Sequence, residues 1–156
     1  MPVVPDEPPW HLKSCRLDTS LTETVKKYHN PELLKSQALA LIDAYSYSVN
    51  VYTDASKTTD NKTSAAFYVP EHNIEHTARL NNGITIFVAE LTAIKLALLW
   101  ITSTINQTVT IFSDSLSSLK ALATGKSTCR PNLILEILNL INSYQNTVTF
   151  VWVPSH

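Results

Sequence analysis

The sequence contains little cysteine, and its cysteines are not arranged for a disulfide framework or a zinc site. Only Cys15 and Cys129 occur among the 156 residues. They lie far apart in the chain and in none of the spacings that bind zinc. We therefore expect two free thiols, which argues against a disulfide-stabilised extracellular module and against a zinc-binding domain.

The sequence also lacks long apolar runs and a surplus of charge. No uninterrupted apolar run reaches the roughly 18 residues of a membrane span, and the first residues lack the basic and apolar regions of a signal peptide. We therefore expect an intracellular protein without a membrane segment. Twelve Lys and Arg against 13 Asp and Glu give a formal charge of −1, which is not the signature of a nucleic-acid binder. A nucleic-acid enzyme of this composition would need a local basic strip.

The first 46 residues differ in composition from the rest of the chain. Four of the eight prolines fall within the first nine residues, as in an extended segment. Residues 31–45 begin with a proline after Asn30, a candidate helix cap, and place apolar residues at helical spacing. We therefore expect residues 1–46 to be a linker with one helix, and residues 47–156 to form one globular domain.

From Tyr47 onward, apolar residues alternate first with the period of strands and then with that of helices. The expected elements are strands at 47–54, 65–69 and 74–80, a helix at 87–101, a strand at 109–114, helices at 116–124 and 133–141, and a strand at 148–153. This order, β-β-β-α-β-α-α-β, predicts a mixed sheet flanked by helices, an α/β or α+β architecture.

Three carboxylates occupy informative places in this pattern. Asp54 and Asp114 each end a predicted strand, and ligands sit outside the carboxyl ends of neighbouring parallel strands. Glu90 is expected in the first turn of the long helix, where the helix dipole favours an acid. The three side chains are therefore candidates for one site, although each has an ordinary structural reading as a turn residue, a cap or a dipole partner.

A cluster of three carboxylates implies a divalent cation, because without one at least one acid would take up a proton. Oxygen ligands without Cys or His favour Mg²⁺ or Mn²⁺. Two such ions can activate a water and stabilise the leaving oxygen of a phosphodiester. The cluster therefore predicts metal-dependent phosphodiester hydrolysis.

Four motifs resemble, in order and spacing, those of ribonuclease H domains. They are Tyr52-Thr-Asp-Ala-Ser56, Ala89-Glu-Leu91, Ser113-Asp-Ser115 and Trp152-Val-Pro-Ser-His156. The sequence is most similar to the ribonuclease H domains of non-LTR (LINE-type) retrotransposon polyproteins, where a segment like Pro8-Pro-Trp10 leads in from the reverse transcriptase region. The resemblance covers almost the whole chain and implies a ribonuclease H-like fold.

The resemblance also implies roles for individual residues. Asp54, Glu90 and Asp114 match the metal-binding acids of the family, which hold Mg²⁺ or Mn²⁺, and the resemblance implies two such ions. His156 matches a mobile histidine that assists water activation or product release. The implied substrate is an RNA/DNA hybrid, recognised through 2′-hydroxyls and backbone shape, and the implied partner is a reverse transcriptase domain in a longer polyprotein.

The sequence departs from the family pattern in two places. Ala55 and residues 63–65 stand where the family often has glycines, and we expect the fold to tolerate them. In the family, a Gly-rich loop, a fourth metal-binding Asp and a final helix follow the last motif, whereas this sequence ends at His156. The resemblance therefore predicts a ribonuclease H domain that is incomplete at its C-terminal end and lacks the final helix.

Three hypotheses about function remain open at this point. The first is an active ribonuclease H that serves retroelement replication. The second is a catalytically inactive, truncated retroelement remnant that binds nucleic acid weakly or not at all. An integrase or transposase of the same broad fold is disfavoured, because those enzymes use two Asp followed by a late Glu, whereas Glu90 lies between Asp54 and Asp114.

Overall fold

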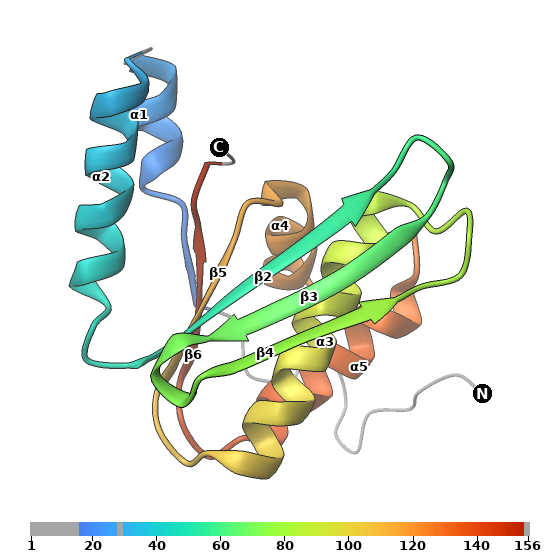
Figure 1. The fold of residues 1–156 in the computed structure, drawn as a ribbon. Coiled ribbons are helices and arrows are strands. Elements are labelled where there is room, and N and C mark those ends of the chain that lie inside the picture. Colours follow the sequence, from blue (N-terminus) through green and yellow to red (C-terminus); the bar gives the residue numbers. More distant parts are fainter. Residues whose placement is uncertain (1–15, 28–29, 155–156) are drawn as a thin grey trace.

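The computed structural model describes residues 16–27 and 30–154, which form a single mixed sheet with helices against one of its faces (Figure 1). The elements in chain order are β1 (Arg16–Asp18), α1 (Leu21–Lys27), α2 (Pro31–Ala44), β2 (Val49–Lys57), β3 (Thr63–Val69), the 3-10 turn η2 (Pro70–His72), β4 (Ile74–Arg79), α3 (Ile86–Thr104), β5 (Val109–Ser113), α4 (Leu116–Thr124), α5 (Pro131–Ser143) and β6 (Val148–Trp152).

The sheet combines an antiparallel meander with a parallel half. Its six strands lie in the order β1-β6-β5-β2-β3-β4. β2, β3 and β4 pair antiparallel, and β2, β5, β6 and β1 pair parallel. Parallel neighbours need crossover connections, and α3 supplies the first of them, between β4 and β5. This confirms the predicted order from β2 to β6 and the ribonuclease H-like fold.

The core lies between the sheet and α3, α4 and α5. Alternate residues of the strands point into it, among them Val51, Phe67 and Ile111. α3 contributes one of its faces to this core. The helix is capped by Thr85, whose hydroxyl accepts a hydrogen bond from Val88 N. Gly125 closes α4 in the left-handed conformation, which glycine adopts without a Cβ clash.

α3 is the most apolar helix of the fold, and by length and composition alone it could cross a membrane. The expectation that no segment reaches that length was therefore wrong for α3: it considered uninterrupted runs, and Glu90 and Lys95 interrupt this one. Within the fold α3 packs against β2, β3 and α5, and half of the apolar window is buried. A core helix of a globular domain needs the same composition, so packing explains it.

The N-terminal segment contains more structure than the linker with one helix that composition predicted. The predicted helix is confirmed as α2, and Asn30 Oδ1 accepts a hydrogen bond from Glu32 N at 2.9 Å. The structure adds α1 and also β1, which extends the sheet parallel to β6. A three-residue strand carries no periodic signal, and its partner Val148–Trp152 is more than a hundred residues away, so local pattern could not reveal it.

β2 also extends further than predicted. Asp54 does not end the strand, because the β2–β3 hairpin continues pairing to Lys57 opposite Thr63. The added residues are small or polar and show no apolar alternation. They are held by the hairpin ladder and by a hydrogen bond between the hydroxyls of Ser56 and Ser64, 2.7 Å apart. Ala55 lies in this regular ladder, so alanine is accommodated where the family often has glycine.

Candidate metal centre

The pairing of β2 with β5 brings two of the predicted acids to the same edge of the sheet. Tyr52 and Phe112 are the last residues paired in this parallel ladder. Asp54 and Asp114 each follow two positions later, so their side chains project from equivalent places on neighbouring strands. The expectation of an acid at the carboxyl end of its strand is confirmed for Asp114, which follows β5, whereas Asp54 lies beyond the β2–β5 pairing but within β2, which continues to Lys57.

Glu90 reaches the same edge from α3. It is the fifth residue of that helix, because α3 begins at Ile86, so it lies in the second turn and not in the predicted first turn. The helix dipole acts mainly within the first turn, so it does not explain why an acid is placed here. Glu90 is only 4% exposed and is the one buried acid among the described residues.

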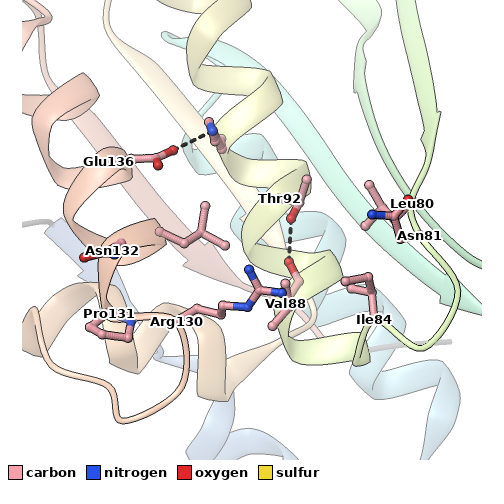
Figure 2. A pocket seen from close by; sticks show the side chains of 11 residues that line it. Leu80, Asn81, Ile84, Val88, Thr92, Arg130, Pro131, Asn132 and Glu136 are labelled. Atoms are coloured by element: carbon pink, nitrogen blue, oxygen red, sulfur yellow. Dashed lines mark hydrogen bonds and ion pairs between the residues drawn. The ribbon is translucent and has the colours of Figure 1, made fainter. Parts of the chain in front are cut away.

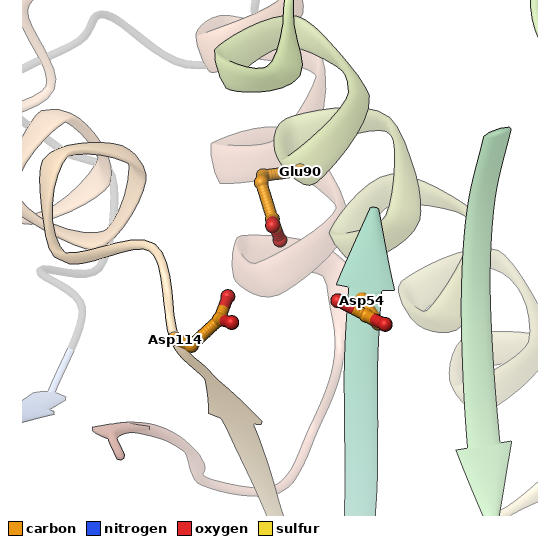
Figure 3. Close-up of side chains that lie close together, drawn as sticks. All are labelled: Asp54, Glu90 and Asp114. Atoms are coloured by element: carbon orange, nitrogen blue, oxygen red, sulfur yellow. The ribbon is translucent and has the colours of Figure 1, made fainter. Parts of the chain in front are cut away.

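The three carboxylates converge on one point (Figure 3). One oxygen from each of Asp54, Glu90 and Asp114 lies within 4.8 Å of the others. Asp54 is exposed, Asp114 is half-buried and Glu90 is buried, so the cluster opens to solvent on the Asp54 side. An ion bound here could therefore contact both these carboxylates and a ligand that approaches from solution.

Glu90 has an electrostatic environment that suits a cation. Its Oε2 is buried and has no hydrogen-bond partner among the described residues. Burial, followed by the charges of Asp114 and Asp54, raises the pKa of Glu90 to about 8. A buried carboxylate oxygen without a hydrogen-bond partner is costly, and so is the repulsion between neighbouring acids. A divalent cation would offset both costs.

The donor set fits Mg²⁺ or Mn²⁺. All three side chains offer carboxylate oxygens, the ligands these ions prefer, and the cluster contains neither Cys nor His. The unpartnered Oε2 of Glu90 points to a ligand that this arrangement lacks. Asp54, Glu90 and Asp114 would hold the ion.

A pocket of about 590 Å³ lies along α3 on the side of α5 (Figure 2). Val88, two residues before Glu90 in α3, lines it together with Arg130 and Asn132 at the start of α5. On the far side, Lys95 Nζ and Glu136 Oε2 form an ion pair at 2.5 Å. The pocket therefore combines an apolar wall with a guanidinium and an amide, close to the helix that carries the buried acid.

Some predicted site residues lie outside the part of the chain that the structure describes. His156 is one of them, so its role stays a prediction. Cys15 and Trp10 lie outside as well, and Cys129 is an exposed free thiol.

One contact at the site was not predicted. Trp152, the first residue of the last motif, is half-buried, and its Nε1 donates a hydrogen bond to the Asp114 carbonyl at 3.1 Å. Its position in an apolar strand gave no local signal of this contact, because the contact arises from the pairing of β5 with β6.

Comparison with known proteins agrees with this fold and cluster. The family model described as RNase H matches residues 46–156. No curated protein matches the chain. The match covers well over half of the chain and includes every strand of the sheet except β1 together with all three acids. The chain belongs to the ribonuclease H family.

Proposed function

We propose that this chain hydrolyses the RNA strand of RNA/DNA hybrids with divalent metal ions held by Asp54, Glu90 and Asp114. The observation that carries the proposal is the buried carboxylate of Glu90, whose Oε2 has no hydrogen-bond partner among the described residues, close to two further acids. Membership of the ribonuclease H family supports the same reaction. The opening of the cluster toward solvent at Asp54 leaves room for a phosphodiester.

The residues of this chain have separable tasks in the proposed reaction. Asp54 and Asp114 hold the ions at the sheet edge, and Glu90 completes the set from α3 after it gives up its proton. Bound Mg²⁺ or Mn²⁺, in two copies, supplies an activated water and stabilises the leaving oxygen. His156 is proposed to assist water activation or product release, as the family pattern implies.

The pocket along α3 supports a nucleic-acid substrate in spite of the net charge of −1. A guanidinium is suited to phosphate, and Arg130 places one beside an amide from Asn132. Contacts of this kind position a backbone and carry no sequence information. The proposed substrate is accordingly defined by its hybrid structure, not by its sequence.

We further propose that the activity serves retroelement replication inside the cell, in a longer polyprotein with a reverse transcriptase. The four motifs that resemble LINE-type ribonuclease H domains support this context. The proposed division of the chain follows from it, with residues 1–46 connecting to the preceding region and residues 47–156 as the ribonuclease H domain. Sequencing the transcript that encodes this chain tests the proposal, which requires reverse transcriptase motifs upstream in the same reading frame.

The experiment for the activity uses the chain with a labelled RNA/DNA hybrid in Mg²⁺ and, separately, in Mn²⁺. The Asp54→Asn variant is expected to lose at least about 100-fold in rate, because removing a metal ligand forfeits several kcal/mol of transition-state stabilisation. Asp60→Asn is a matched control, because Asp60 is an exposed acid in the β2–β3 turn whose ion-pair partner is Lys62.

The proposal requires that the chain cuts hybrid but not duplex RNA, that D60N cuts equally well and that D54N does not. If the chain cleaves hybrid with neither Mg²⁺ nor Mn²⁺, the proposal is contradicted. That result would favour the alternative of a non-catalytic retroelement remnant, and a gel-shift measurement with the same hybrid would then show whether binding persists.

A further inference from the structure

The backbone of Asp114 is held by a side chain from the neighbouring strand. β5 ends at Ser113, so Asp114 is the first residue beyond regular structure. The last backbone hydrogen bond between β6 and β5 at this edge runs from Val153 N to Ser113 O, 3.0 Å. One residue further along, Trp152 Nε1 donates to Asp114 O at 3.1 Å. The indole N–H therefore extends the hydrogen bonding by one residue after the ladder has ended.

The residues on either side of Asp114 are tied together. Ser115 N donates a hydrogen bond to Ser113 Oγ at 3.1 Å, and Ser113 is 1% exposed. This bond closes a small loop around Asp114, and Trp152 fixes the carbonyl within that loop. The orientation of the peptide that follows Asp114 thus depends on two side chains.

The other two acids do not need such help. Asp54 lies within the β2–β3 ladder opposite Ala66, and Glu90 lies within the regular part of α3. Backbone hydrogen bonds of a sheet and a helix hold their Cα atoms on both sides. Asp114 alone among the three carries its carboxylate from a position outside a strand or a helix, where an added hydrogen bond has the largest effect on placement.

We propose that Trp152 is a positioning residue for the metal centre, which acts through its indole N–H on the backbone of Asp114. The inference rests on the proposed function, because it assumes that the three acids bind a divalent cation. Trp152 touches neither the ion nor the substrate in this scheme. Its donor keeps the Asp114 carboxylate at the distance from Glu90 and Asp54 at which one ion contacts all three.

An indole is well suited to this task. Trp152 is half-buried and packs against the core with its ring, so that the ring is fixed while Nε1 faces the strand end. A buried Trp N–H usually finds a partner, and here the partner belongs to a residue of the cluster. Phenylalanine would keep an aromatic ring in the same place and lose the donor.

The test measures Mn²⁺ affinity of the full chain by electron paramagnetic resonance, without a substrate. Trp152→Phe is expected to weaken Mn²⁺ binding by about tenfold, the lower end of what outer-shell partners of metal ligands contribute. Trp100→Phe is the matched control, because its ring contacts Phe67 and His72. It lies ten residues beyond Glu90 on α3, about 15 Å along the helix axis.

A second variant separates the donor from the shape of the ring. Replacing Trp152 by benzothienylalanine keeps the bicyclic ring and exchanges the N–H for sulfur, so packing is preserved. The proposal requires that this variant also loses about tenfold in Mn²⁺ affinity, with a melting temperature in EDTA close to that of the unchanged chain. If the benzothienylalanine variant binds Mn²⁺ as tightly as W100F does, the proposal is overturned, whatever the stability of W152F.

The two proposals fail in different ways in this experiment. If the unchanged chain binds no Mn²⁺, the metal centre itself is refuted, and the positioning role is refuted with it. If the unchanged chain binds Mn²⁺ and loses that binding in D54N, but the benzothienylalanine variant binds equally well, only the role of Trp152 is refuted.

Discussion

The two ends of strand β5 differ in whether the buried polar groups around them are hydrogen-bonded. At its amino end, Tyr144 is buried and its hydroxyl is hydrogen-bonded to the backbone of Gln107: it donates to Gln107 O at 2.5 Å and accepts from Gln107 N at 2.9 Å. Close by, the buried hydroxyls of Ser48 and Thr110 share a hydrogen bond of 2.6 Å. At the carboxyl end, Glu90 is equally buried and its Oε2 is without a partner among the described residues.

This difference distinguishes the end of the sheet whose buried polar groups are hydrogen-bonded from the end where we propose the metal centre. Buried polar groups in native proteins are nearly always satisfied, and an exception calls for an explanation. The amino end follows the rule, and its hydrogen bonds join the strands to the loops around them. The carboxyl end breaks the rule at the place where three acids meet, which is what a site for a cation requires before the cation binds.

The strongest test of the comparison is the Glu90→Gln variant. We expect hybrid cleavage to fall by at least about 100-fold, because a neutral amide replaces a metal-binding carboxylate. An E90Q variant that cleaves at the rate of the unchanged chain would show that the carboxyl end of the sheet is not a metal centre.

Stability of the same variant provides a second readout with a defined sign. The pKa of Glu90 is raised from 4.5 to about 8 in the folded chain. As pH rises through this window, the unfolded chain ionises Glu90 while the folded chain keeps it protonated, so stability is lost. In EDTA, E90Q should therefore gain in melting temperature relative to the unchanged chain from about pH 4.5 to about pH 8. Equal pH profiles would contradict the raised pKa.

At the other end of β5, Tyr144→Phe is expected to change stability and leave cleavage alone. It removes the hydroxyl that satisfies both backbone groups of Gln107. The two lost hydrogen bonds stabilise the fold by about 0.5–1.5 kcal/mol each, which urea unfolding of the metal-free chain measures. If the Tyr144→Phe variant loses cleavage at urea concentrations at which it is still folded, the two ends of β5 are not independent.

The raised pKa of Glu90 also predicts the pH dependence of Mn²⁺ binding. Because a metal ion displaces the proton of Glu90, affinity should rise about tenfold per pH unit until pH reaches the pKa of about 8, and level off above it. Calorimetric titration in buffers of different ionisation enthalpy also counts the protons released. Affinity that is constant from about pH 6 to about pH 8 would show that Glu90 is already ionised without the metal.

Much of the fold follows from local patterns along the chain. The apolar stripe of α3, the β-branched runs of β5 and β6 and the proline and glycine signals at helix ends each reflect the environment of consecutive residues. The three acids were candidates from their places near predicted strand and helix ends, and the resemblance of the surrounding motifs to ribonuclease H domains selected them from the other acids of the chain. β1 and the extension of β2 were not, because those residues owe their strand conformation to their partners.

The sequence alone determined which residues are apolar and with what period, and hence which segments become strands and helices. It also determined that Asp54, Glu90 and Asp114 are the acids available near strand and helix ends. Tertiary structure decided that β2 and β5 pair in parallel with Asp54 and Asp114 in equivalent positions, and that α3 buries Glu90 above them. It also decided that Trp152 reaches the backbone of Asp114. Contacts between residues far apart in the chain depend on strand pairing and helix packing, and no local pattern encodes the distances that these impose.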